Sequence, residues 1–156
     1  MYNKVFLGGT CSDTAWRDEL IPILESKGID YFNPVVKDWT EDCIKIEENE
    51  KDNRCNIHLY LITSEMKGVY SIAEMMVSAL TGVKTIFIVQ SDGFSEGELR
   101  SLTATAKLAR KYSEDNLVVH FMSKSEGLEI VPHMIEYLSP TKKEWYSSYV
   151  EGILNV

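Results

Sequence analysis

The stretch IHLYLITSEMKGVYSIAEMMVSAL, residues 57–80, decides the fold that the sequence predicts. Its first seven residues, Ile57–Thr63, form an apolar run with the length of a buried β-strand. Its last ten, Ser71–Leu80, have the apolar spacing of a helix, and Gly82 follows as a stop signal. A buried strand that leads directly into a helix is typical of a parallel sheet covered by helices.

The same alternation extends along the chain in both directions. Pro132, inside the last apolar helical segment, counts against the continuity of that helix. Because right-handed crossovers place helices on both faces of a parallel sheet, we expect one three-layer α/β domain with five strands. Besides the central pair, strands are expected at residues 4–8, 29–33, 84–90 and 116–122, and helices at 13–26, 40–54, 95–112 and 127–138.

Length and charge limit the class of protein. The chain has 156 residues, enough for one domain with a proper core, and its formal net charge is −8. This acidity disfavours nucleic acid and anionic membrane surfaces as partners. The acidic run Glu41–Asp52 is interpreted as a solvated helix face. A small anionic ligand stays possible, because backbone N–H groups at a helix start can bind it locally.

The cysteines and histidines indicate neither metal nor disulfides. Cys11, Cys43 and Cys55 are odd in number and form no CxxC pair, and the three histidines stand apart. Free thiols suit a reducing compartment. The N-terminus has no basic-then-apolar leader, and no apolar run has membrane-spanning length. We therefore expect a cytoplasmic protein without a metal site.

Ligands of such sheets bind beyond the carboxyl ends of the strands, where the strand order reverses. The first of these loops is Gly8-Gly9-Thr10-Cys11-Ser12. Its glycines would let the backbone approach a ligand, and Thr10 and Ser12 add hydroxyl groups. The spacing fits neither a dinucleotide-binding nor a P-loop motif. A tight turn without a ligand is an equal alternative.

Two further loops carry candidate chemistry. Glu74 stands near a helix start among apolar neighbours, so it is either an ordinary N-terminal glutamate or a carboxylate kept in a cleft. Residues 31–34, Tyr-Phe-Asn-Pro, and Trp39 place aromatic rings near a strand end, where they could stack on a flat base or simply pack in the core.

These segments occur in an order that resembles a known family. Val5–Thr10, Trp16-Arg17, Tyr31–Pro34, Trp39 and Gly68–Glu74 together resemble the nucleoside 2-deoxyribosyltransferase-like proteins, most closely a small bacterial and phage branch. The resemblance covers roughly residues 4–122. Its most specific element is the helix start Ser71-x-x-Glu74.

The resemblance implies a fold and a chemistry. Its sheet has the flavodoxin-like order 2-1-3-4-5, the subunits form homo-oligomers, and no cofactor takes part. A helix-start glutamate, matched here by Glu74, attacks the anomeric carbon of a 2′-deoxyribose and displaces the base. Water or a second base then takes the sugar. An asparagine of a neighbouring subunit completes the site in the family, and Asn116 is its match.

Two positions depart from the family pattern. The aspartate usual at the start of the third strand is replaced by Asn56. The acid near the sugar's 5′ hydroxyl is replaced by Gly68, where the related nucleotide N-hydrolases place a serine that holds a 5′-phosphate. Loss of this acid removes a repulsion against phosphate, so a monophosphate substrate becomes plausible. The same losses also favour a protein that binds without turnover.

The main hypothesis is an enzyme that cleaves or transfers the N-glycosidic bond of a 2′-deoxynucleoside or its monophosphate. Glu74 and Asn56 are its expected catalytic residues. The alternatives are a nucleotide sensor or sequestering protein and an enzyme that cleaves an NAD-like ribosyl donor. The expected substrate-binding residues are Gly8, Gly9, Thr10, Ser12, Asn33, Trp39, Gly68, Ser71 and Asn116.

The last residues are expected to form a separate feature. Residues 1–138 are assigned to the domain, and 139–156 to a tail that packs on the domain or on a neighbouring subunit. The tail contains the aromatic segment Trp145–Tyr149, which is too apolar for a free extension. Together with Asn116, it predicts a homo-oligomer.

Overall fold

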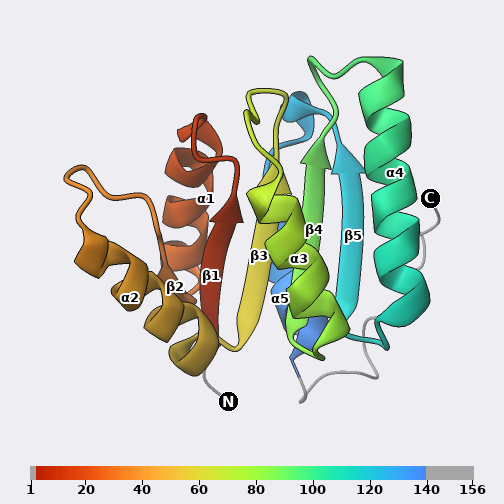
Figure 1. The fold of residues 1–156 in the computed structure, drawn as a ribbon. Coiled ribbons are helices and arrows are strands. Elements are labelled where there is room, and N and C mark those ends of the chain that lie inside the picture. The colour runs from red at the N-terminus through yellow and green to blue at the C-terminus, as the bar shows by residue number, and fades with distance from the viewer. Residues whose placement is uncertain (1–2, 140–156) are drawn as a thin grey trace.

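Five parallel strands form one sheet in the order β2-β1-β3-β4-β5 (Figure 1). The computed structural model describes residues 3–139. All four neighbouring strand pairs are parallel. The predicted α/β class, the five strands and their order are therefore confirmed. The strands are β1 (Lys4–Gly9), β2 (Asp30–Phe32), β3 (Ile57–Ile62), β4 (Lys84–Gln90) and β5 (Leu117–Met122).

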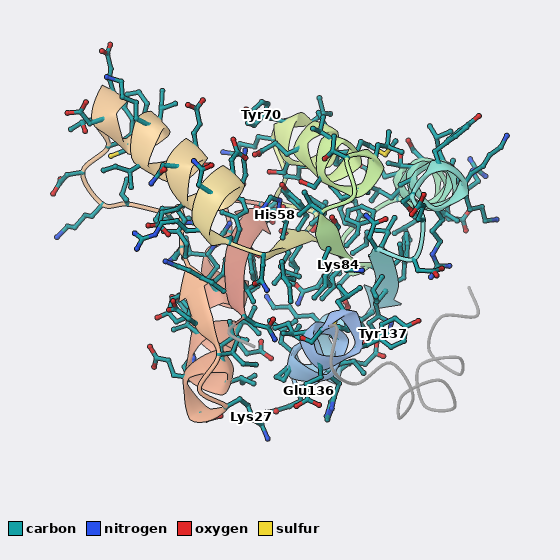
Figure 2. All side chains as sticks on the ribbon, turned by 90° about the horizontal axis from the view of Figure 1, so that it is seen from below. Lys27, His58, Tyr70, Lys84, Glu136 and Tyr137 are labelled. Carbon is teal, nitrogen blue, oxygen red and sulfur yellow. The ribbon has the colours of Figure 1, made fainter. Side chains whose placement is uncertain are left out.

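Helices cover both faces of the sheet. Helices α2, α3 and α4 lie on one face and α1 and α5 on the other, so that Figure 2 shows three layers from below the sheet. Two shorter elements follow α2 and β5. The helices are α1 (Ala15–Ser26), α2 (Glu41–Asn49), α3 (Tyr70–Leu80), α4 (Glu96–Tyr112) and α5 (Val131–Leu138), with the π-helix η1 (Glu50–Arg54) and the 3-10 turn η2 (Lys124–Glu126).

The core is divided by the sheet into two apolar clusters, because successive side chains of a strand point to opposite faces. Leu59 of β3 belongs to the cluster under α1 and α5. Its neighbour Tyr60 belongs to the cluster under α3 and α4. β3 and β4 are buried along almost their whole length, which explains the apolar residues 59–62 and 86–89 at their centres.

The helix ends follow the sequence signals with one correction. Ser95 caps α4 in a capping box with Glu98, as the predicted start at residue 95 requires. The last helix was expected to begin at residue 127 but begins at Val131, with Pro132 in its first turn. Proline fits there because the first helical N–H groups have no partner inside the helix.

The acidic run is not simply a solvated face, and that interpretation is wrong for Glu50. This side chain is buried, and its carboxylate lies 2.6 Å from Lys4 Nζ and 2.8 Å from Arg54 Nη1. The pair with Lys4 connects η1 to the start of β1, and the pair with Arg54 lies within η1.

The predicted tail, with its aromatic segment at 145–149, lies outside the described residues. The homo-oligomer therefore stays a prediction. Within residues 3–139 no helix is both long and apolar enough to cross a membrane.

Candidate functional site

Two neighbouring cavities open at the carboxyl ends of β1 and β3, and both are lined by Gly9, Cys11 and Ser71. The carboxylate cavity has a volume of about 280 Å³, and its further lining residues are Phe6, Gly8, Pro34, Val35, Val36, Trp39, Glu47 and Glu74. The loop cavity has a volume of about 300 Å³, and its further lining residues are Thr10, Ser12, Met66, Lys67, Gly68 and Tyr70.

Glu74 is held inside the carboxylate cavity by an ion pair. Its side chain is 12% exposed, and Oε2 lies 2.6 Å from Nζ of Lys51, which is 16% exposed. Burial lowers the pKa of Lys51, but its hydrogen bond to Glu74 and the charge of that carboxylate outweigh burial, and the net shift is upward. Glu74 is therefore not an ordinary solvent-facing glutamate. It is a charged group enclosed beside its partner.

Lys51 reaches this position from the π-helix η1. A buried network of hydrogen bonds connects η1 to the sheet. The Lys51 carbonyl can only accept, so His58 donates to it through Nε2 at 2.9 Å. His58 Nδ1 then accepts from Ser78 Oγ at 3.0 Å, and Tyr60 Oη lies 2.9 Å from the same oxygen. Figure 2 shows His58 on β3, between η1 and α3. π-Helical turns are frequent at functional sites.

The network predicts a pH dependence of stability. Burial lowers the pKa of His58 below its usual 6.5, although the bond to the Lys51 carbonyl opposes this. As the pH falls below about 6.5, the unfolded chain binds a proton before folded His58 does, so the free energy of unfolding decreases. Burial shifts the pKa of His120 in the same direction.

Urea unfolding between about pH 7.5 and 5.5 measures this dependence. His58→Gln retains hydrogen-bonding groups but does not titrate, so we expect a smaller decrease in the variant than in the wild type. The difference isolates His58 from His120 and from the carboxylates. Equal pH dependence in both proteins would contradict a neutral, buried His58.

Glu47 is a second carboxylate on the same cavity and lies one helical turn before Lys51. Burial and, next, the negative charge of Glu74 raise its pKa, whereas Lys51 and Arg17 act in the opposite direction. The interpretation of the acidic run as a solvated face is thus also wrong for Glu47. Nothing in the local sequence distinguishes Glu47 from its acidic neighbours, because its environment comes from α3.

Apolar and aromatic groups form the rest of the carboxylate cavity. Trp39 is 63% exposed at its border, and Pro34 and Phe6 contribute further apolar surface. Such walls suit a flat, partly apolar ring. Asn33 does not line this cavity; its Oδ1 accepts from the N–H of Val35 at 3.1 Å and shapes the loop after β2.

The two glycines of the first loop are required by the protein itself. A Cβ on Gly9, whose φ is +112°, would lie 2.1 Å from the carbonyl oxygen of Leu61. A Cβ on Gly8 would lie 2.8 Å from the ring of Tyr60. Close packing of β1 against β3 thus explains both glycines. A role for them in binding a ligand stays a prediction, although both line the carboxylate cavity.

The comparison with protein families decides the identity of the domain. A family model described as "Nucleoside 2-deoxyribosyltransferase like" matches residues 2–92, more than half of the chain. The chain belongs to this family. No curated protein and no solved structure matches the chain. The matched region includes Glu47, Lys51 and Glu74 and ends just after β4.

Two residues predicted for this nucleoside 2-deoxyribosyltransferase-like site lie at the amino-terminal ends of the strands, away from the two cavities. Asn56 precedes β3, where its Oδ1 accepts from the N–H of Lys4 at 2.8 Å. Asn116 is buried before β5, and its Nδ2 donates to the carbonyls of Ala79 and Val83 at 2.8 and 2.9 Å. The structure does not bring Asn56 to Glu74, and the expected role of Asn116 in the site of a neighbouring subunit stays a prediction. Lys51, which the sequence interpretation missed, is the partner instead.

The hydroxyl groups of the loop cavity are used within the protein. Ser12 Oγ donates to the carbonyl of Glu65 at 2.5 Å, and Ser71 Oγ donates to that of Gly9 at 3.1 Å. Thr10 is buried, and its Oγ1 accepts from the N–H of Thr63 at 3.0 Å. The hydrogens of Ser12 and Ser71 are therefore already donated to carbonyls of the protein.

Gly68 leaves the loop cavity open, because a Cβ built on it would meet no atom within 4 Å. Lys67, Tyr70 and the N–H groups at the start of α3 supply further donors to this cavity.

Hydrogen bonds from Arg17 hold the loop at residues 8–12 in place. This buried guanidinium donates to the carbonyl of Leu7 through Nη2 at 2.9 Å and to that of Thr10 through Nη1 at 2.8 Å. It also lies 4.0 Å from the centre of the Trp16 ring. The pair Trp16-Arg17 therefore holds the loop after β1 in place, and this loop lines both cavities. Among residues 3–139 no cluster of three His, Cys, Asp or Glu side chains could hold a metal ion.

Proposed function

We propose that this protein cleaves the N-glycosidic bond of a 2′-deoxynucleoside or its 5′-monophosphate, with Glu74 as the nucleophile. The observation that carries the proposal is Glu74 itself, which lines a cavity with an aromatic border and is held there by an ion pair to Lys51. Membership of the nucleoside 2-deoxyribosyltransferase-like family supports a nucleoside as the class of substrate.

In the proposed reaction the Glu74 carboxylate attacks C1′ of the sugar. A C1′–O bond forms to the carboxylate, and the C1′–N bond breaks with its electron pair leaving on the base. Because Lys51 holds Oε2, the attacking atom would be Oε1. Positive charge develops on the sugar in the transition state, and the negative charge of the Glu74 carboxylate stabilises it. Water, or a second base in a transfer reaction, then releases the sugar from Glu74.

The two cavities together accommodate the parts of a nucleotide. The base and sugar would occupy the carboxylate cavity beside Trp39, and a 5′-phosphate would enter the loop cavity past Gly9 and Ser71. Lys67 and the start of α3 would donate to the phosphate. One charge-assisted hydrogen bond contributes about 1.5–3 kcal/mol, so the monophosphate should bind at least about tenfold more tightly than the nucleoside.

A second candidate function is nucleotide binding without turnover. It is favoured by the ion pair itself, since Glu74 already has a partner, and by the absence of an acid at Asn56 and Gly68. A sensor or a sequestering protein would keep the cavities and lose the reaction.

One assay separates the two functions. The protein is incubated with matched 2′-deoxynucleosides and monophosphates, with and without an acceptor base, and free base is measured by chromatography. Calorimetric titration of the same compounds measures binding. We expect base release and tighter binding of the monophosphates. Binding without base release would favour the sensor, and neither binding nor release would contradict both functions.

A further inference from the structure

Two carboxylates approach the carboxylate cavity from different elements. Glu74 comes from α3 and Glu47 from α2, and both line the cavity. Only Glu74 makes the close contact to Lys51, with a separation of 2.6 Å. Two carboxylates therefore line the same cavity. Glu74 is paired with the cation of Lys51, and Glu47 is the second carboxylate.

Cleavage of an N-glycosidic bond needs a proton as well as a nucleophile. An expelled base takes the electron pair of the broken bond, and protonation of one of its nitrogens makes it a better leaving group. A pair of carboxylates divides these tasks when the surroundings keep one charged and favour the protonated form of the other.

We propose that Glu47 is the acid and base of the reaction: it protonates the departing base and then accepts a proton from the attacking water. The inference rests on the proposed function of Glu74 and assigns a role to a residue outside the predicted site. Its geometric basis is that Glu47 lines the cavity together with Glu74 and lies one turn before Lys51.

The groups that face Glu47 support this division. Glu74 on α3 raises the pKa of Glu47, after burial as the larger cause, and Glu48 on its own helix adds to the shift. Lys51 on η1 and Arg17 on α1 act in the opposite direction, but the net shift is upward. The protonated form of Glu47 therefore persists to a higher pH than in an ordinary glutamate.

The atoms balance over the two halves of the reaction. In the first half, C1′ bonds to Glu74, the C1′–N bond breaks, and the base nitrogen takes the proton of Glu47. In the second half, a water oxygen bonds to C1′, the ester to Glu74 breaks, and the water proton passes to Glu47. Both residues return to their starting states.

The test compares two leaving groups. One substrate is 2′-deoxyguanosine monophosphate, and the other is its N7-methyl derivative, whose positively charged base leaves as a neutral molecule without a proton. Glu47→Gln removes the acid and keeps the shape, and Glu41→Gln is the matched control because Glu41 is an exposed acid of the same helix. The first-turnover burst of free base is measured, so a slow second half does not interfere.

We expect Glu47→Gln to slow the burst with the unmethylated substrate by about 10²–10⁴-fold. The burst with the methylated substrate should change only a few-fold, and Glu41→Gln should behave as the wild type with both. The activity of Glu47→Gln should also lose the decline at high pH that deprotonation of Glu47 causes in the wild type.

Equal losses with both substrates, or no loss with either, would overturn the role of Glu47 while leaving Glu74 as the nucleophile. If the wild type released no base from either substrate, the proposed function itself would fail. A thermal melt of each variant identifies any loss that comes from misfolding.

Discussion

Glu74→Ala is expected to lower the rate of base release by at least about ten-thousandfold, because the variant has no group to attack C1′. Binding of a monophosphate should survive. The cavity walls come from other residues, and removal of a negative charge leaves Lys51 available to an anion. We therefore expect equal or tighter binding together with near-complete loss of turnover.

Chromatography of free base and calorimetric titration of the same monophosphate measure the two effects. A matched control is Glu48→Ala, which removes an exposed acid from α2. In the wild type, mass spectrometry after a short reaction should detect a deoxyribosyl adduct on the peptide that contains Glu74. A Glu74→Ala protein with wild-type rates, on any substrate that the wild type cleaves, would exclude Glu74 as the nucleophile.

The sheet could be predicted because burial on both faces leaves a strong signal. The expected strand at residues 84–90 matches β4, and the expected strand at 57–63 exceeds β3 by one residue. The start of the last helix was missed because apolar residues continue from Leu128 into α5, and only Pro132 marks the beginning.

The environment of Glu74 could be predicted only in part. Its neighbours in sequence indicate a carboxylate in an apolar setting, and the structure encloses it. The partner could not be predicted, because Lys51 stands in a strongly acidic run and its contact spans 23 residues. The π-helical turn that carries Lys51 has no signature in the hydrophobic pattern, since that pattern assumes a period of 3.6 residues.

The hydrogen-bond partners of the hydroxyl groups could not be predicted from the sequence either. Ser12 and Ser71 do line the loop cavity, as their positions after strands suggested. The sequence identifies them as donors but does not reveal that nearby carbonyls already take their hydrogens. Similarly, Asn56 was expected to be a catalytic residue, whereas its amide bonds to the start of β1. Hydrogen-bond partners are tertiary properties, and local composition does not determine them.

Lys51→Met is expected to impair both stability and turnover. Without the ammonium group of Lys51, the ion pair that joins η1 to α3 is lost, and Glu74 and Glu47 share the cavity without a neighbouring cation. Breaking a fully buried ion pair costs about 3–5 kcal/mol. Both partners here keep some exposure, at 16% and 12%, so we expect a loss of about 2 kcal/mol. For a domain of this size, that corresponds to a decrease in melting temperature of about 4–8 °C.

The effect on turnover should be separable from the effect on stability. Lys51 acts through Glu74 as a positioning residue, and its loss should slow base release by about a hundredfold with a smaller change in KM. Because the charge of Lys51 lowers the pKa of Glu47, its removal should also move the high-pH decline in activity to higher pH. A purely structural lysine would leave that pH profile unchanged.

Two further variants test whether the charge of Lys51 is responsible. Lys51→Arg keeps the cation and should restore part of the rate, although its forked head differs in shape. Lys45→Met removes an exposed lysine of α2 that lies 3.9 Å from Asp42, and it should change stability by less than about 0.5 kcal/mol. If Lys51→Met melted and turned over like Lys45→Met, the ion pair would have no role in holding Glu74, and the nucleophile would have to be positioned by the fold of α3 alone.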